Sequence, residues 1–145
     1  MKKKLINYLI SLIIIATTFG QEVDQIKLAN EYYQSKEYDK AVDIYKKLSK
    51  QKRNIPQIHS NYLDLMINND NPDDAYKYIN YVVKQYPGNS RYRVDQIYVA
   101  RLLPNQKEYK RLKDALYDAS RGNVNTLKKI ADELSQRQLH NDALV

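Results

Sequence analysis

The sequence of 145 residues predicts an all-α protein built from stacked helix pairs. Three observations support this fold class. Only three Gly and few β-branched residues beyond position 15 argue against a sheet. Apolar residues recur with helical spacing, without strand alternation. The sequence also repeats itself with a period of about 34 residues, which is typical of a solenoid. The length allows one small domain or one short repeat array.

The N-terminus carries the features of an export signal. Three lysines at positions 2–4 precede an apolar run over residues 5–16. Small residues then flank Phe19, which is typical of a signal-peptidase site and places the expected cleavage between Gly20 and Gln21.

We therefore predict a cleaved signal peptide over residues 1–20 and an exported mature chain over 21–145, periplasmic or secreted, with no transmembrane span. The alternative is an uncleaved membrane anchor, but the apolar run is shorter than the roughly 20 residues that cross a bilayer. The absence of Cys suits an oxidising compartment and excludes disulfides, thiol nucleophiles and Cys-ligated metals.

The mature chain divides into units of this repeat length. Small and apolar residues recur in register, as in the pairs Ala41/Ala75, Tyr45/Ile79 and Leu48/Val82, whereas the third unit departs from the pattern with Gln96 and Lys113. The expected repeats cover about 22–55, 56–89 and 90–123, followed by a partial repeat over 124–145. Because the fourth unit is partial, we expect a fragment of a longer array, the alternative being that its helix docks on a partner.

Each unit is expected to hold two helices. The helices are expected near 22–35, 38–52, 56–69, 72–86, 90–103, 106–120 and 124–138. Asn71 before Pro72 is a strong helix start, because Asn caps the first turn and Pro needs no hydrogen-bond donor there. Pro87 and Gly88 end that helix, and Ser90 is the predicted cap of the next.

These motifs resemble the tetratricopeptide repeat family over about residues 22–145. The resemblance rests on the run Leu28-Ala29-Asn30-Glu31-Tyr32, on Tyr38, Ala41, Tyr45 and Leu48, and on their equivalents Ala75, Ile79, Val82 and Pro87. It implies a right-handed α-solenoid of about seven helices that serves as a scaffold for other proteins, with an inner groove lined by the first helix of each unit.

The resemblance also implies a peptide-binding groove. Its expected lining is Asn30, Tyr33 and Gln34 in the first unit, Asp64, Ile67 and Asn68 in the second, and Tyr98, Arg101 and Leu102 in the third. Asn and Gln side chains hydrogen-bond an extended backbone, and Tyr supplies contact area at low entropic cost. Ser60 and Val94 stand where the family's carboxylate clamp needs Lys, so recognition of a C-terminal carboxylate is not expected.

No catalytic, metal or cofactor site is expected. The chain has two histidines about eighty positions apart, and His59, three residues before Tyr62, is expected to pack inside the fold. Phosphate-binding loops and nucleophile elbows are absent. The acidic pairs Asp73-Asp74 and Asp132-Glu133 are interpreted as helix-surface charges, so a hydrolase is the least favoured class.

The predicted function is therefore that of a non-catalytic, exported scaffold with a protein or peptide partner. Removing the three leader lysines from 24 basic residues leaves 21 against 17 acidic ones, a net charge of +4. This mild charge does not favour nucleic acid as partner, although binding of nucleic acid or another polyanion through Lys/Arg and Tyr is the alternative.

Overall fold

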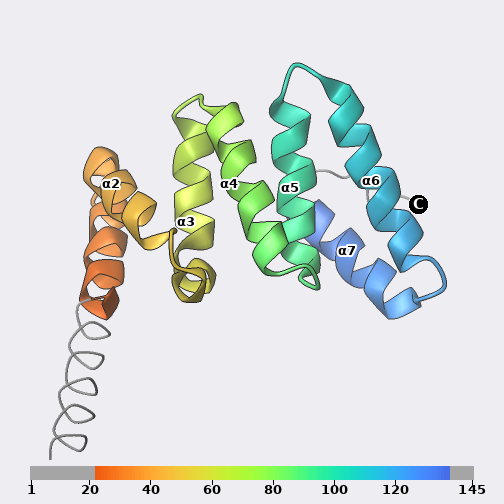
Figure 1. Ribbon diagram of the computed structural model, residues 1–145, viewed down its shortest axis with the longest axis horizontal. Helices are drawn as coiled ribbons and strands as arrows, with labels where there is room; N and C mark the ends of the chain where they lie inside the picture. Colours follow the sequence, from red (N-terminus) through yellow and green to blue (C-terminus); the bar gives the residue numbers. More distant parts are fainter. Residues whose placement is uncertain (1–21, 138–145) are drawn as a thin grey trace, which may run out of the picture. The chain divides into compact units, whose positions relative to one another are not determined.

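The computed structural model describes residues 22–137, and all regular structure in this part of the chain is helical (Figure 1). The predicted signal peptide and the last eight residues of the predicted partial repeat lie outside the described residues. A helix over 22–34 is followed by α2 (Tyr38–Leu48), a short 3-10 helix (Lys52–Asn54), α3 (Ile55–Asn68), α4 (Pro72–Gln85), α5 (Ser90–Leu102), α6 (Gln106–Ser120) and α7 (Val124–Gln136). The all-α prediction is confirmed for these residues, with helix ends within a few residues of those expected.

The chain forms two compact units, one ending at Leu65 and the other beginning at Met66, so the division falls inside α3. The described part of the first unit contains the helix over 22–34, α2 and most of α3. The described part of the second unit contains the end of α3 and α4 to α7. Each unit has its own core.

The first unit is built around a fully buried tyrosine. Tyr45 on α2 has no exposed surface, and its ring packs against that of Tyr62 with 5.9 Å between centroids. Its hydroxyl donates to Asn30 Oδ1 at 2.6 Å, which satisfies a polar group that would otherwise be costly to bury. Ala29 and Ala41 are also fully buried, which allows close approach of the helices that carry them.

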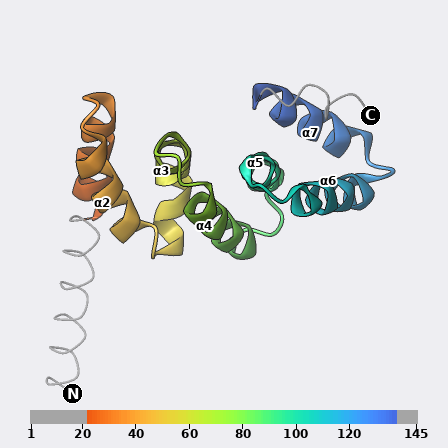
Figure 2. The ribbon, with the colours of Figure 1, turned by 90° about the horizontal axis from the view of Figure 1, so that it is seen from above.

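The second unit is organised around α5, which contacts α4, α6 and α7 (Figure 2). Its core cluster consists of Val94, Ile97, Leu116, Ile130 and Leu134, with Tyr98, Tyr109, Leu112 and Tyr117 packed against it. These residues come from α5, α6 and α7 at helical spacing, so each helix turns one apolar stripe inward. Burial of these stripes is the main source of stability for this unit.

Four asparagines cap helices, and they recur at the repeat interval. The side chains of Asn71, Asn89, Asn105 and Asn123 accept from the backbone N–H groups of Asp74, Tyr92, Lys107 and Thr126, respectively. Asn71 and Asn105 are one repeat period apart, as are Asn89 and Asn123. The prediction that Ser90 caps α5 is wrong. Asn89 is the cap, and the Ser90 hydroxyl contacts Glu133 Oε1 at 3.3 Å.

The turns after the helix over 22–34 and after α3 have the same geometry. Lys36 and Asp70 have left-handed backbones, with φ of 62° and 56°. The amides of Lys36 and Glu37 donate to the carbonyls of Tyr33 and Tyr32, at 3.1 and 2.9 Å. The same two bonds return one repeat period later, from Asp70 to Ile67 and from Asn71 to Met66, at 3.1 and 3.3 Å. This bond pair satisfies carbonyl groups at the helix end.

The third such turn is built differently. Pro104 stands in the position of Lys36 and Asp70, and Pro has no N–H to donate. The side chain of Gln106 supplies donors instead, because its Nε2 lies 2.7 Å from the Leu103 carbonyl and 3.1 Å from that of Arg101. A side-chain amide thus satisfies carbonyls at the end of α5.

Helices two apart in the sequence also contact each other. The number of residues that separates the contacting side chains is larger for α5 and α7 than for the earlier pairs. Asn30 contacts Asn61, 31 residues on, and Tyr76 contacts Glu108, 32 residues on. Asp95 on α5, by contrast, pairs with Arg137, the residue that follows α7, 42 positions on. Figure 1 shows α7 running obliquely to α5.

Candidate binding surface

Asn30, the first of the predicted groove residues, is held inside the first unit. Its Oδ1 accepts from Tyr45 Oη and from Asn61 Nδ2, the latter at 3.1 Å. Asn61 Nδ2 also lies 3.3 Å from Tyr45 Oη, so three helices meet at one polar cluster. Asn61 was not among the predicted site residues. It lies 31 residues after Asn30, whereas the repeat register pairs Asn30 with Asp64, so the sequence pattern does not point to it.

Tyr33 and Asp64 lie near this cluster. Tyr33 is half-buried, and its ring packs against Tyr38 with 5.9 Å between centroids. Burial raises the pKa of Tyr33, and the negative charge of Asp64 raises it further. The structure therefore brings Asn30, Tyr33 and Asp64 together, whereas Gln34 is exposed at the end of its helix.

The remaining predicted groove residues belong to the second unit. Asn68 is exposed at the last position of α3. Tyr98 is half-buried on α5, with the guanidinium carbon of Arg137 5.5 Å from its ring centroid. Arg101 is exposed three residues after Tyr98, on the same side of the helix. Tyr98 and Arg101 thus share one face of α5.

A partly buried ion pair lies beside Tyr98. Asp95 is 1 % exposed, and its Oδ1 accepts from Arg137 Nε at 2.7 Å. The same guanidinium therefore contacts both a carboxylate and an aromatic ring. Sequence reasoning missed this pair, because no local spacing connects residues 42 positions apart.

Glu133, four residues before Arg137, carries a second, half-buried carboxylate. One of its oxygens contacts the Ser90 hydroxyl, and the other, Oε2, is buried without a hydrogen-bond partner in the part of the chain that the structure describes. Burial raises the pKa of Glu133, and the nearby charge of Asp95 contributes in the same direction.

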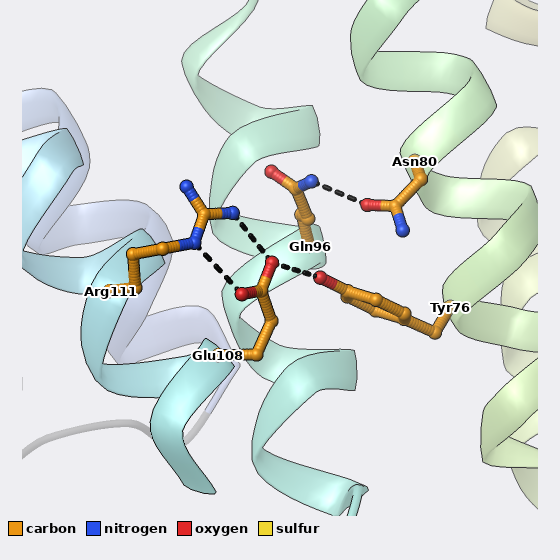
Figure 3. A network of polar contacts seen from close by, with 5 residues as sticks. All are labelled: Tyr76, Asn80, Gln96, Glu108 and Arg111. Atoms are coloured by element: carbon orange, nitrogen blue, oxygen red, sulfur yellow. Dashed lines mark hydrogen bonds and ion pairs between the residues drawn. The ribbon is translucent and has the colours of Figure 1, made fainter. Parts of the chain in front are cut away.

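A network of polar contacts connects α4, α5 and α6 (Figure 3). Tyr76 Oη donates to Glu108 Oε1 at 2.6 Å, and Arg111 donates to both Glu108 oxygens, at 2.8 and 2.6 Å. Beside them, Gln96 Nε2 donates to Asn80 Oδ1 at 2.6 Å. The network joins side chains from three consecutive helices.

The electrostatics of this network follow from its hydrogen bonds. The bonds from Arg111 and Tyr76 lower the pKa of Glu108 to about 2. Burial and the bond to Glu108 raise the pKa of Tyr76 to about 12. Glu108 is thus ionised and Tyr76 protonated at neutral pH, which suits a tie between α4 and α6 better than proton transfer.

No group of three or more His, Asp or Glu side chains within residues 22–137 is arranged to hold a metal ion. His59 is 3 % exposed on α3, in agreement with the packed position expected for it. A hollow of about 130 Å³ in the first unit is lined by Glu22, Val23, Ile26, Arg53, Asn54 and Gln57. Its one acid and one base form an ion pair with each other.

Over the same described residues, no helix combines the length and the apolar composition that crossing a bilayer requires. Comparisons of the chain with protein-family models, with curated proteins and with solved structures find no match.

Proposed function

We propose that the chain is an exported, non-catalytic scaffold of the tetratricopeptide type that binds a protein or peptide through the inner surface of its helices. In this proposal the helix pairs stack as a right-handed α-solenoid. The observation that carries it is the recurrence, one repeat period apart, of the left-handed turn at Lys36 and Asp70 with the same two hydrogen bonds. The asparagine caps recur at the same interval.

The chemistry of the first unit suits an extended peptide. Tyr33 offers a half-buried ring and Asp64 a carboxylate beside the amide groups of Asn30 and Asn61. A ring held by its neighbours gives contact area at small entropic cost, and a carboxylate selects a peptide with a basic residue. In the second unit, Tyr98 and Arg101 offer a ring and a cation on one face of α5.

Binding of nucleic acid or another polyanion through Lys/Arg and Tyr is the second candidate. Salt dependence separates the two candidates. Affinity for a polyanion falls steeply between low and moderate salt because counterions are released on binding, whereas affinity for a peptide groove changes little.

The test uses peptides selected from a random phage-displayed library on the immobilised protein, with affinity then measured by calorimetry. The double substitution Tyr33→Ala/Tyr98→Ala is expected to weaken binding by about tenfold or more, since interface tyrosines often contribute over about 1 kcal/mol each. Tyr81→Ala on α4, outside the predicted groove, is the control. Unchanged affinity in the double variant, with helicity intact, would falsify the groove assignment.

A further inference from the structure

Charges in the first unit are segregated along the sequence. Residues 22–43 contain six acidic and three basic side chains, whereas residues 46–63 contain five basic side chains and no acidic one. All five basic residues lie between positions 46 and 53. The equivalent stretches one and two repeat periods later carry one basic residue each, so this concentration of charge is not part of the repeat.

Four of these side chains, Lys46, Lys47, Lys50 and Lys52, are named here the basic surface, and all are exposed. Lys46 and Lys47 occupy the last turn of α2, and the Lys50 amide donates to the Lys47 carbonyl at 3.4 Å, so the chain continues to turn. Spacings of three and four residues place these three ammonium groups on one side.

Three lysines of the basic surface, Lys46, Lys47 and Lys50, have no paired carboxylate among the described residues. Lys27 and Lys40 each pair with a glutamate three or four residues away. Cations at a helix C-terminus stabilise the helix, but that effect is confined to its last turn and the lysines continue beyond it.

An ion pair connects this segment to the start of the described chain. Arg53 donates from Nε and Nη2 to the two oxygens of Glu22, at 2.9 and 2.7 Å. Glu22 follows Ala16, the end of the apolar run, by six residues. Six extended residues span at most about 20 Å. In a chain that keeps residues 1–20, as in the uncleaved-anchor alternative, the basic surface is therefore close to the headgroups of the bilayer that holds the apolar run.

We infer that the basic surface docks on the phosphate headgroups of an anionic lipid layer. Clusters of lysine near a bilayer gain roughly equal binding energy from each charge. A lipid surface needs only charge, whereas single-stranded nucleic acid is held by charge together with exposed aromatic rings. Residues 46–53 contain no aromatic residue, and Tyr45 just before them has no exposed surface. The inference goes beyond the proposed function, because it concerns the end of α2 and not the inner groove.

The test measures partition of the full chain onto vesicles by flotation, with neutral phosphatidylcholine vesicles compared with vesicles that also contain phosphatidylglycerol. The N-terminal apolar run contributes equally in every variant, so the quantity of interest is the gain that the anionic lipid brings. Substitution Lys46→Gln/Lys47→Gln/Lys50→Gln is expected to reduce this gain by about tenfold or more, and added salt to reduce it in the wild type.

The matched control is Lys107→Gln/Lys110→Gln/Lys128→Gln, which removes the same charge from exposed positions of α6 and α7. This control variant is expected to keep the increase in vesicle binding that the anionic lipid brings. The inference is overturned if the wild type shows no preference for anionic vesicles, or if both triple variants lose it equally. It is also overturned if the first variant loses binding to a single-stranded oligonucleotide while its vesicle binding is unchanged.

Discussion

Lys36 and Asp70 share one backbone conformation, one repeat period apart, and each is followed by an amide that closes the same hydrogen bond across its helix end. Non-glycine residues pay an energetic cost for a positive φ of this size, which glycine avoids. The conformation is thus retained at two positions whose side chains differ in charge, so the turn is determined by the backbone bonds.

Substitution Lys36→Gly or Asp70→Gly is therefore expected to raise the free energy of unfolding, by about 0.5 to 1 kcal/mol each. Urea denaturation followed by circular dichroism measures the change. Ser35→Gly, one residue earlier and without positive φ, is the control and should be neutral or destabilising. A loss of stability in both glycine variants would contradict the role given to these turns.

Replacing Asn123 tests the asparagine caps. Its Oδ1 accepts from the Thr126 amide at 3.0 Å, so Asn123→Ala is expected to cost about 1 kcal/mol of stability. Asn125→Ala, two residues later and exposed inside α7, removes the same side chain without removing a cap. It should be neutral or slightly stabilising, because Ala favours helix. Thermal unfolding of the two variants gives the comparison, and equal effects would argue against capping.

The Tyr76–Glu108–Arg111 network predicts acid sensitivity. The folded-state pKa of Glu108 is about 2, below its unfolded value, so its contribution to stability is present above about pH 4.5 and is lost as pH falls towards 2. Since the carboxylate is partly exposed, the contribution is about 1 kcal/mol. Glu108→Gln should therefore lower stability at pH 6 and have little effect at pH 2.

Chemical denaturation across this pH range measures the difference between Glu108→Gln and wild type. Tyr76→Phe, which removes one of the bonds that lower the pKa of Glu108, should shift the acid-induced loss to higher pH. Tyr81→Phe is the control on the same helix. A difference between Glu108→Gln and wild type that does not vary with pH would contradict the assignment.

The pKa of Glu133 is shifted in the opposite direction from that of Glu108, so its effect on stability depends on pH in the opposite way. Its folded-state pKa is raised by burial, so the neutral form favours folding, and this stability is present below the unfolded pKa and lost as pH rises through the folded pKa. Glu133→Gln, which keeps an acceptor for Ser90 and removes the charge, is expected to stabilise the protein at pH 7 by about 1 kcal/mol. Asp132→Asn, at an exposed neighbour, is the control. Destabilisation at pH 7 would indicate that the charge itself is used.

The helices were predictable because the sequence marks their ends. Helix ends are marked by Asn71 with Pro72 and by Gly122 after α6. The conformational preferences of these residues are local, so they can be predicted without the tertiary fold. The choice of Ser90 over Asn89 was wrong because both residue types are good caps, and the first helical turn decides between them.

The contacts between helices were not predictable in the same way. Tyr76 with Glu108 and Asp95 with Arg137 depend on how neighbouring helices cross, and the α7 crossing does not follow the spacing of the repeat. Asn30 was predicted to line the groove, but its side chain is hydrogen-bonded within the fold. This position depends on Asn61, which comes from the next helix pair.

The substitution of Gln106 for a backbone donor makes the third helix connection different in kind from the first two. In the first two connections the hydrogen bonds join backbone groups, so they are kept when side chains are substituted. At Pro104, the Leu103 amide still donates to the Ala100 carbonyl, but the Leu103 and Arg101 carbonyls accept from the Gln106 side chain, and Gln106→Ala removes those two bonds. Exchange with deuterium should then become faster at the end of α5, so that a point change loosens this connection without altering the core.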